Sequence, residues 1–212
     1  MACQETSNRK STTISGSSDV ALILHNELRT AKLGSVFSGT YPAYATWDDY
    51  EFPVNNLRIN PATSKPDYSF TDLVYLFDDA STETIGGNGH LPHRWYIGSS
   101  ISPHVHWTAR TTGDVLWRLN YKMWDNATVE PAWTTMDTSS VYATYTSSGD
   151  AMISEFSDIT CSALTAVSPN IKMKLSRVGG ATADTYIGDV EFLKFDVHYK
   201  KDSTGSTTEY VK

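Results

Sequence analysis

Beyond residue 40, apolar and polar side chains alternate along much of the chain. In VLWRLNYKMW (115–124), apolar residues occupy every second position and polar residues lie between them. NIKMKLSR (170–177) and VEFLKFDVHY (190–199) repeat this pattern. Because successive side chains of a strand point to opposite faces, a period of two gives one buried face and one solvated face. The alternation therefore predicts half-buried antiparallel strands.

A continuous strand over 190–199 has a definite orientation. Its apolar side chains face the core, namely Leu193, Phe195, Val197 and Tyr199. Its polar side chains face the opposite way, namely Lys194, Asp196 and His198. In 115–124 the same reasoning directs five side chains toward the core, namely Val115, Trp117, Leu119, Tyr121 and Met123. These positions define much of the expected core.

Other short aromatic and β-branched runs predict further strands, at FTDLVYLFD (70–78), RWYI (94–97), PHVHWTAR (103–110) and SSVYATYT (139–146). The turn TTGD (111–114) predicts that the strands on either side of it form one hairpin. Two Gly-rich segments are expected to be loops, IGGNGHLPH (85–93) and VGGATADTYIGD (178–189). Many short strands with few helix signals predict an all-β fold, an antiparallel β-sandwich of jelly-roll type.

The N-terminal region has a different composition. Residues 1–19 are rich in Ser and Thr and nearly devoid of large apolar groups, so we expect an arm that orders only on a partner. VALILHNELRTAK (20–32) predicts a short amphipathic helix with Asp19 as its N-cap, and a buried strand over VALILH is the alternative. Leu24 and Leu28 share one face of this helix and are the expected partner contacts.

The chain is therefore expected to divide into an N-terminal attachment segment, 1–40, and a β-sandwich domain, 41–212. The attachment segment carries a formal charge of +1 and the remainder carries −8. A near-neutral arm on an acidic body favours docking to protein. We expect removal of 1–40 to spare the folding of the body but to prevent attachment.

The composition excludes several classes of partner. The net charge is −7 and the sequence shows no stripe of Lys and Arg, so no nucleic-acid partner is expected. No apolar run reaches 18 residues, so no membrane partner is expected. Cys3 and Cys161 are too few for a disulfide framework, which favours synthesis in a reducing compartment.

The sharpest local motif is PHVHW at 103–107. On a strand, His104 and His106 project from the same face, and Asp196 and His198 do so on another predicted strand. If the two strands are neighbours, the four side chains converge and form either a divalent metal site or a hydrogen-bonded polar cluster. We expect the polar cluster, without a cofactor. We also expect local stability to fall when the histidines are protonated below about pH 6.

The remaining motifs do not predict catalysis. GGNG (86–89) lacks the Lys-Ser/Thr of a phosphate-binding loop and is followed by Pro92 rather than a helix, so a turn is expected there. The sequence contains neither a G-x-S-x-G elbow nor a Cys beside a His in a protease-like setting. We therefore expect no catalytic residues and no enzyme activity.

A set of short motifs in a fixed order carries a family resemblance. The motifs are WDD (47–49), HLPHRW (90–95), ISPHVHW (101–107), DTYIGDVEFLKFDVHYKKD (184–202) and GSTTEY (205–210). Over about residues 45–210, the chain resembles a group of phage and prophage virion structural proteins. Those proteins typically carry LPH-x-W, PH-x-HW and D-x-HY motifs followed by a Gly-Ser segment. The chain departs from them in its longer N-terminal region and in Lys200 and Lys201.

The resemblance implies a β-rich component of a virion, made in the cytoplasm of a bacterial host. The expected function is a non-catalytic accessory protein on the head, neck or tail surface, bound to other virion proteins. A homo-oligomer is expected because virion scaffolds are symmetric, and the family resemblance alone favours a trimer. Two other functions stay open. A glycan-binding host-recognition module needs exposed aromatic residues at loop tips, and a cupin-like metal-dependent enzyme needs His104 and His106 in a closed pocket.

Overall fold

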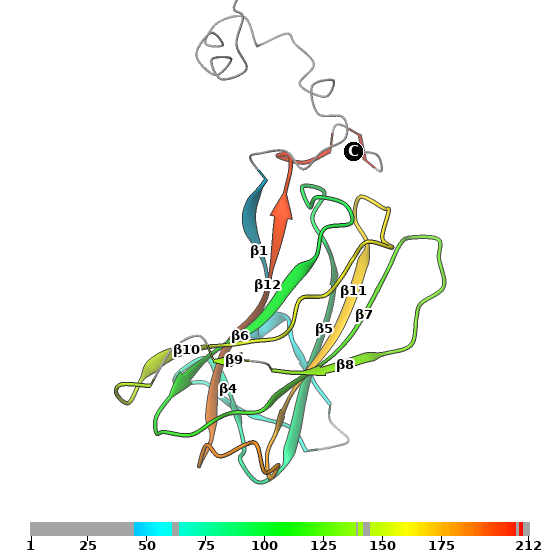
Figure 1. Ribbon diagram of the computed structural model, residues 1–212. Helices are drawn as coiled ribbons and strands as arrows, with labels where there is room; N and C mark the ends of the chain where they lie inside the picture. Colours follow the sequence, from blue (N-terminus) through cyan, green and yellow to red (C-terminus); the bar gives the residue numbers. More distant parts are fainter. Residues whose placement is uncertain (1–44, 61–63, 139, 142–144, 207, 210–212) are drawn as a thin grey trace, which may run out of the picture. The chain divides into compact units, whose positions relative to one another are not determined.

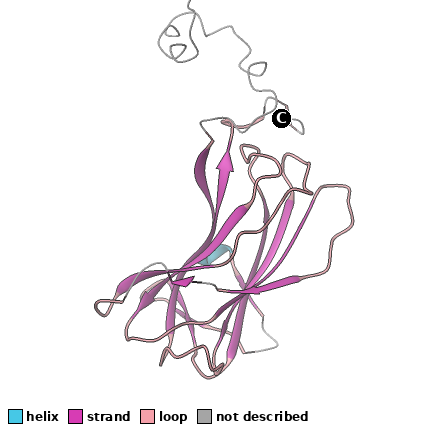
Figure 2. Cartoon of the chain, viewed as in Figure 1, coloured by secondary structure: helices cyan, strands magenta, loops and turns pink. Residues whose placement is uncertain are grey.

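The computed structural model of the protein describes residues 45–60, 64–138, 140–141, 145–206 and 208–209. Nearly all regular structure in these residues is β-strand, and one 3-10 helix spans Val54–Asn56 (Figure 2). The predicted all-β class is thereby confirmed. The predicted arm and short helix, including Leu24 and Leu28, lie outside the described residues.

The strands form two antiparallel sheets that pack as a sandwich (Figure 1). Sheet A contains, in spatial order, β3 (Asp67–Ser69), β4 (Val74–Phe77), β12 (Val190–Lys201), β6 (Ile101–Ala109), β10 (Asp150–Glu155) and β9 (Ser140–Val141), and β12 also pairs with β1 (Thr46–Pro53). Sheet B contains β2 (Arg58–Ile59), β5 (Thr82–His90), β11 (Asn170–Val178), β7 (Trp117–Trp124) and β8 (Thr134–Asp137).

The strand order is that of a jelly roll, as predicted. β4 pairs with β12, β5 with β11, β6 with β10 and β7 with β8. The chain is thus one long antiparallel ribbon that is wrapped so that its strands are shared between the two sheets. Jelly rolls occur in viral capsid proteins, lectins and cupins, so this topology is compatible with all three expected functions and does not choose between them.

Aromatic side chains from both sheets fill the space between them. The Trp117 ring of β7 lies 5.2 Å from the Phe77 ring of β4 and 6.3 Å from the Phe192 ring of β12, both edge to face. Such pairs add to the stabilisation from buried area. The predicted inward face of β7 is confirmed, because Trp117 and Leu119 are buried and the inward residues further along the strand pack against the same core.

β12 departs from the predicted orientation at Leu193. Phe195, Val197 and Tyr199 are buried as predicted, but Leu193 is 37% exposed. A β-bulge between Phe192 and Lys194 shifts the register against β6. The bulge inserts one extra residue, so Phe192 lies on the buried face in place of Leu193. The prediction assumed an unbroken strand and was wrong for this residue.

β6 and β7 do not form the predicted hairpin. β6 belongs to sheet A and β7 to sheet B, and the segment between them crosses from one sheet to the other. The Thr185 and Tyr186 amides donate to the Asp114 carbonyl at 2.8 and 3.1 Å, and the Arg110 amide donates to the Tyr186 hydroxyl at 2.7 Å. The TTGD turn does mark a change in the direction of the chain. The contacts with the loop that precedes β12, which is distant in the sequence, then carry β7 into sheet B instead of pairing it with β6.

β5 runs through the Gly-rich segment that was predicted to be a loop, so the turn expected at GGNG is wrong as well. Gly87 and Gly89 leave room for neighbouring side chains. A Cβ at Gly87 would lie 3.0 Å from Leu57 Cδ2 and 3.3 Å from the Phe52 ring. A Cβ at Gly89 would collide with the Tyr50 hydroxyl. Packing against large neighbours therefore outweighs the low strand propensity of glycine.

Three weaker strand predictions were met only in part. RWYI (94–97) contains an isolated bridge from Trp95 to Lys201 but no strand. In SSVYATYT, the strand among the described residues is limited to β9. The strand expected over 70–78 begins only at Val74. The loop expected after residue 178 does connect β11 to β12.

Arg177 occupies an inward position of β11 and is fully buried with Asp184. Its Nη2 and Nε atoms donate to the two Asp184 carboxylate oxygens at 2.8 and 3.1 Å. The guanidinium also donates to three main-chain carbonyls, those of Phe77, Gly188 and Tyr186. All five of its N–H donors therefore have an acceptor. This network ties β11 to β4 and to the loop that precedes β12.

Replacing Arg177 by Met is expected to lower the free energy of unfolding by about 3–5 kcal/mol, because Asp184 would stay buried without its partner. Urea denaturation followed by tryptophan fluorescence measures this loss. The matched control is Arg118→Met, which removes an exposed ion pair with Asp137 and is expected to cost less than about 1 kcal/mol. Equal losses in the two variants would contradict a special role for the buried pair.

Candidate functional site

The two strands that carry the predicted histidine motif are neighbours in sheet A. β12 pairs with β6, and the register places Asp196 opposite His104. These side chains lie on the outer face of the sheet, because Val105 and Phe195 of the same strands belong to the core. His104 and His106 therefore point away from the interior between the sheets, whereas the cupin-like alternative requires them to line a closed pocket.

Asp196 lies at the centre of the cluster, with a side chain that is 1% exposed. His104 Nε2 lies 2.5 Å from Asp196 Oδ1, and His106 Nε2 lies 3.2 Å from Asp196 Oδ2. Lys194 Nζ lies 3.1 Å from the same Oδ2 and also contacts Glu51. Asp196 Oδ1 and His106 Nε2 fall outside hydrogen-bond geometry, so their contacts are close ionic contacts rather than linear hydrogen bonds. One carboxylate is thus surrounded by three nitrogen-bearing side chains.

His198, the fourth predicted member, has a different partner. Its Nε2 lies 2.9 Å from Asp49 Oδ1, in agreement with the pairing of β1 and β12 that places Asp49 opposite His198. Its ring packs against the His104 ring with centroids 4.1 Å apart. The structure therefore brings together three of the four residues expected to converge, and it directs the polar end of His198 to β1.

The charges within the cluster are mutually stabilising. Burial lowers the pKa of His104, but the neighbouring Asp196 carboxylate outweighs this effect, so the pKa lies above its ordinary value. Burial raises the pKa of Asp196, but His104 and His106 outweigh it and hold that pKa well below its ordinary value. Both shifts favour an imidazolium–carboxylate pair. Protonation of His104 thus stabilises the cluster, which reverses the sign of the pH effect expected from the sequence.

The same three residues are of the types that bind transition metals. Their potential ligand atoms lie within 4.8 Å of one another. A tetrahedral zinc ion with bonds of about 2.0–2.1 Å would hold two ligand atoms about 3.3 Å apart. The 2.5 Å contact between His104 and Asp196 is shorter than this and suits a direct imidazolium–carboxylate ion pair. The Lys194 ammonium beside Asp196 would also repel a cation. Both features favour the ion pair over a metal ion.

A second polar cluster joins three of the sequence motifs at Asp48. Asp48 Oδ2 lies 3.0 Å from Arg94 Nε and 3.2 Å from Lys201 Nζ, and it accepts a hydrogen bond from the Tyr199 hydroxyl at 3.3 Å. Arg94 Nε also donates to the Tyr199 hydroxyl at 2.5 Å. The cluster ties β1 and the loop after β5 to the end of β12. Sequence reasoning missed it, although each member belongs to one of the quoted motifs.

Two further features lie near sheet A, a buried thiol and a small hollow. Cys161 is buried, and burial raises the pKa of its thiol to about 12, whereas catalytic thiols have a lowered pKa. A hollow bordered by His104, Glu155 and Asp158 has a volume of about 120 Å³. Ligand pockets of small-molecule enzymes usually measure about 300–1,000 Å³.

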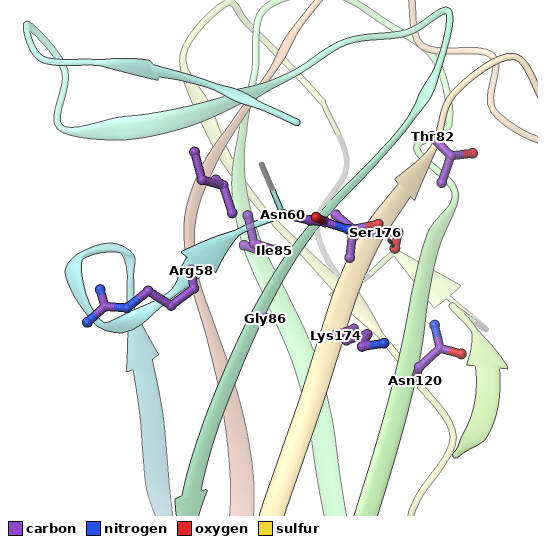
Figure 3. Close-up of a pocket in the computed structure, with 10 residues that line it drawn as sticks. Arg58, Asn60, Thr82, Ile85, Gly86, Asn120, Lys174 and Ser176 are labelled. Atoms are coloured by element: carbon purple, nitrogen blue, oxygen red, sulfur yellow. Dashed lines mark hydrogen bonds between the residues drawn. The ribbon is translucent and has the colours of Figure 1, made fainter. Parts of the chain in front are cut away.

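A larger hollow of about 520 Å³ lies on the outer face of sheet B (Figure 3). Arg58 and Lys174 extend from the strands on either side of the one that carries Gly86 (Figure 3). The sequence shows no basic stripe here, because the cations of this face come from separate strands that become neighbours only in the folded sheet.

Comparisons with known proteins add little to this geometry. No protein-family model matches the sequence, and no curated protein matches it. A solved structure described as that of the infectious bursal disease virus Gx strain contains a similar chain, with 14% identity and a TM-score of 0.36. The match covers 76% of this chain and 33% of that chain, so this chain spans about a third of its length. Within the described part of the chain, no helix is long and apolar enough to cross a membrane.

Replacing His104 by Gln is expected to reduce stability in a pH-dependent way. Because the folded-state pKa of His104 is raised, its contribution is fully present below the unfolded value of about 6.5 and is lost as pH rises through the folded value. The Asp196 contribution is lost only in acid, below about pH 4. The difference in thermal midpoint between wild type and variant should therefore be largest between about pH 4 and 6.5.

Thermal scans from pH 4 to 9 measure this difference, with His90→Gln on β5 as the control. His90 lies in sheet B, apart from the cluster, so the control should show no such trend. A destabilisation by His104→Gln that grows as the pH rises would contradict the assigned charge state.

Elemental analysis tests the same cluster for metal. Protein purified without chelators and without a His-tag is expected to hold less than stoichiometric transition metal, because the Lys194 ammonium and the protonated His104 ring occupy the positions around Asp196. A stoichiometric metal that disappears in the double variant His104→Ala, His106→Ala would overturn the proton-based arrangement.

Proposed function

We propose that the protein is a non-catalytic structural component of a bacteriophage virion, attached to the surface of the head, neck or tail. The observation that carries this proposal is that residues of the sequence motifs contact one another within the fold. Asp48 binds Arg94, and Asp196 contacts His104, so residues from separate motifs bind one another within the fold. These contacts hold neighbouring strands together. Few polar groups of the motifs are then left to bind a substrate.

Two further observations support a structural role. The motifs occur in the order that resembles phage virion proteins, and the strand order is one that capsid proteins use. A fold alone does not establish a function, so the motif order and the engaged side chains carry the greater weight. In this proposal the cluster at Asp196 works without a metal cofactor, and the partners are other virion proteins and further copies of the chain.

An apolar turn offers a contact surface for assembly. Phe70 and Leu73 lie in the turn between β3 and β4 and are 83% and 60% exposed. Leu73 has a φ of 58°, a left-handed conformation that costs a non-glycine residue about 1–2 kcal/mol. An exposed and strained leucine contributes little to the stability of its own chain. Its presence supports a contact with another subunit, and the trimer favoured from the sequence is the state we propose.

The double variant Phe70→Ser, Leu73→Asn is expected to fold normally but to lose self-association. Asn tolerates the left-handed conformation, so the free energy of unfolding should stay unchanged or rise by up to about 1 kcal/mol. Light scattering at micromolar concentration measures the oligomer. Mass spectrometry of purified particles, made with the wild-type or the variant gene, measures incorporation.

The matched control is Val129→Asn, at an isolated residue that is 90% exposed in another loop. It should assemble and be incorporated as wild type. Wild-type protein that is absent from purified particles would overturn the proposed function, and a wild-type monomer would overturn the assembly through this turn. The contacts expected from Leu24 and Leu28 stay predictions.

A further inference from the structure

The outer face of sheet B is basic although the chain as a whole is acidic. Alternation within the paired strands places five cations on this face, namely Arg58, Arg118, Lys122, Lys172 and Lys174. Arg118 pairs with Asp137, and Glu130 bridges two of the lysines. The face therefore keeps an excess of positive charge, which attracts anions.

Two of these cations have no acidic partner among the described residues, namely Arg58 and Lys174. Lys174 Nζ instead lies 4.5 Å from the centroid of the Trp133 ring. Lys122 Nζ lies 4.6 Å from the same centroid. The ring holds the Lys174 side chain in place without neutralising its charge. Arg58 and Lys174 are therefore the cations that an incoming anion can pair with.

The strand register sets the shape of the hollow between these two cations. One row crosses all five strands of sheet B, through Arg58, Gly86, Lys174, Asn120 and Thr135. Neighbouring strands lie about 4.8 Å apart, so the main chains at Arg58 and Lys174 are separated by about 10 Å. Gly86 lies midway and has no side chain. The row is therefore open at its centre, with room for about one sugar ring.

Neutral hydrogen-bonding groups complete the lining of the hollow. Thr82, Thr84 and Ser176 supply hydroxyl groups. The Asn120 amide oxygen accepts a hydrogen bond from Thr135 at 2.6 Å, which leaves the amide N–H donors for a ligand. Hydroxyl and amide groups suit the many hydroxyls of a sugar. Among the described residues, no aromatic side chain lines the hollow, and the nearby Trp133 ring is occupied by Lys122 and Lys174. Proteins that bind single-stranded nucleic acid instead stack bases on accessible aromatic rings.

We propose that the outer face of sheet B binds an acidic polysaccharide, with one sugar placed over Gly86. The side chains of Arg58 and Lys174 point away from Gly86 on opposite sides (Figure 3), where they meet the carboxylate or sulfate groups of the neighbouring sugars. The guanidinium and the ammonium pair with the anionic groups of the chain, and Asn120 with the neighbouring hydroxyls holds the sugar ring. The hollow is open along the sheet, so the polymer extends beyond it in both directions. This binding goes beyond the structural role proposed above and does not depend on it.

Calorimetric titration of the full chain tests the proposal, with oligogalacturonate as the carboxylated probe and heparin fragments as the sulfated probe. Arg58→Gln and Lys174→Gln are each expected to weaken binding about tenfold, the usual effect of losing one charge-assisted contact. Lys65→Gln is the matched control, since it removes an exposed lysine that does not line the hollow. It should bind as wild type. Circular dichroism confirms that each variant is folded.

Each alternative gives a distinct result. No binding to either acidic probe overturns the proposal, and so does equal binding of neutral dextran. Tighter binding of a thymidine oligonucleotide would assign the face to nucleic acid instead. If Lys65→Gln weakens binding of the acidic probes as much as Arg58→Gln and Lys174→Gln do, the interaction depends on the overall charge and not on this site. None of these binding results bears on whether the chain is present in particles. This proposal and the proposed function can therefore fail separately.

Discussion

A guanidinium in the interior of a protein needs an acceptor for each of its N–H groups, and Arg177 meets this requirement with Asp184 and three main-chain carbonyls. The requirement fixes the loop between β11 and β12. That loop presents Tyr186 to the Arg110 amide and so holds the crossing from β6 to β7. It also fixes where β12 begins. The register of β12 against β6 shifts at the bulge between Phe192 and Lys194, and beyond the bulge it places Asp196 opposite His104. The candidate site thus depends both on this buried ion pair and on the bulge.

Much of the fold could be predicted because alternation is a local property. The inward residues of β7 and β11 follow from a period of two, and the number of such segments favours a jelly roll. The pairing of strands is not local. The hairpin expected at TTGD fails because contacts near Asp114 carry the chain to the other sheet. Gly87 and Gly89 of β5 are explained by the neighbouring side chains of Leu57, Phe52 and Tyr50, which the local sequence does not reveal.

The candidate site likewise combines features that are local in the sequence with features that depend on strand pairing. His104 and His106 share a face because they are two residues apart, and Asp196 joins them because β6 and β12 are neighbours. The bulge at Leu193 lies before Asp196 and shifts the register of β12, so that Asp196 rather than Phe195 lies opposite His104. The Asp48 cluster and the basic face of sheet B were missed, because their members come from segments that are far apart in the chain. A motif reveals such a cluster only after the strand order is known.

Different parts of the sandwich have different roles in this account. The polar motif residues hold neighbouring strands together, and we propose that the apolar turn between β3 and β4 and the outer face of sheet B make the contacts with other molecules. A cryo-electron microscopy reconstruction of purified particles at side-chain resolution tests this division most directly. We predict density for the chain on the particle surface, with Phe70 and Leu73 buried against another subunit and the hollow of sheet B open to solvent. Particles fully explained by other chains, or a particle contact made through the histidine cluster, would contradict it.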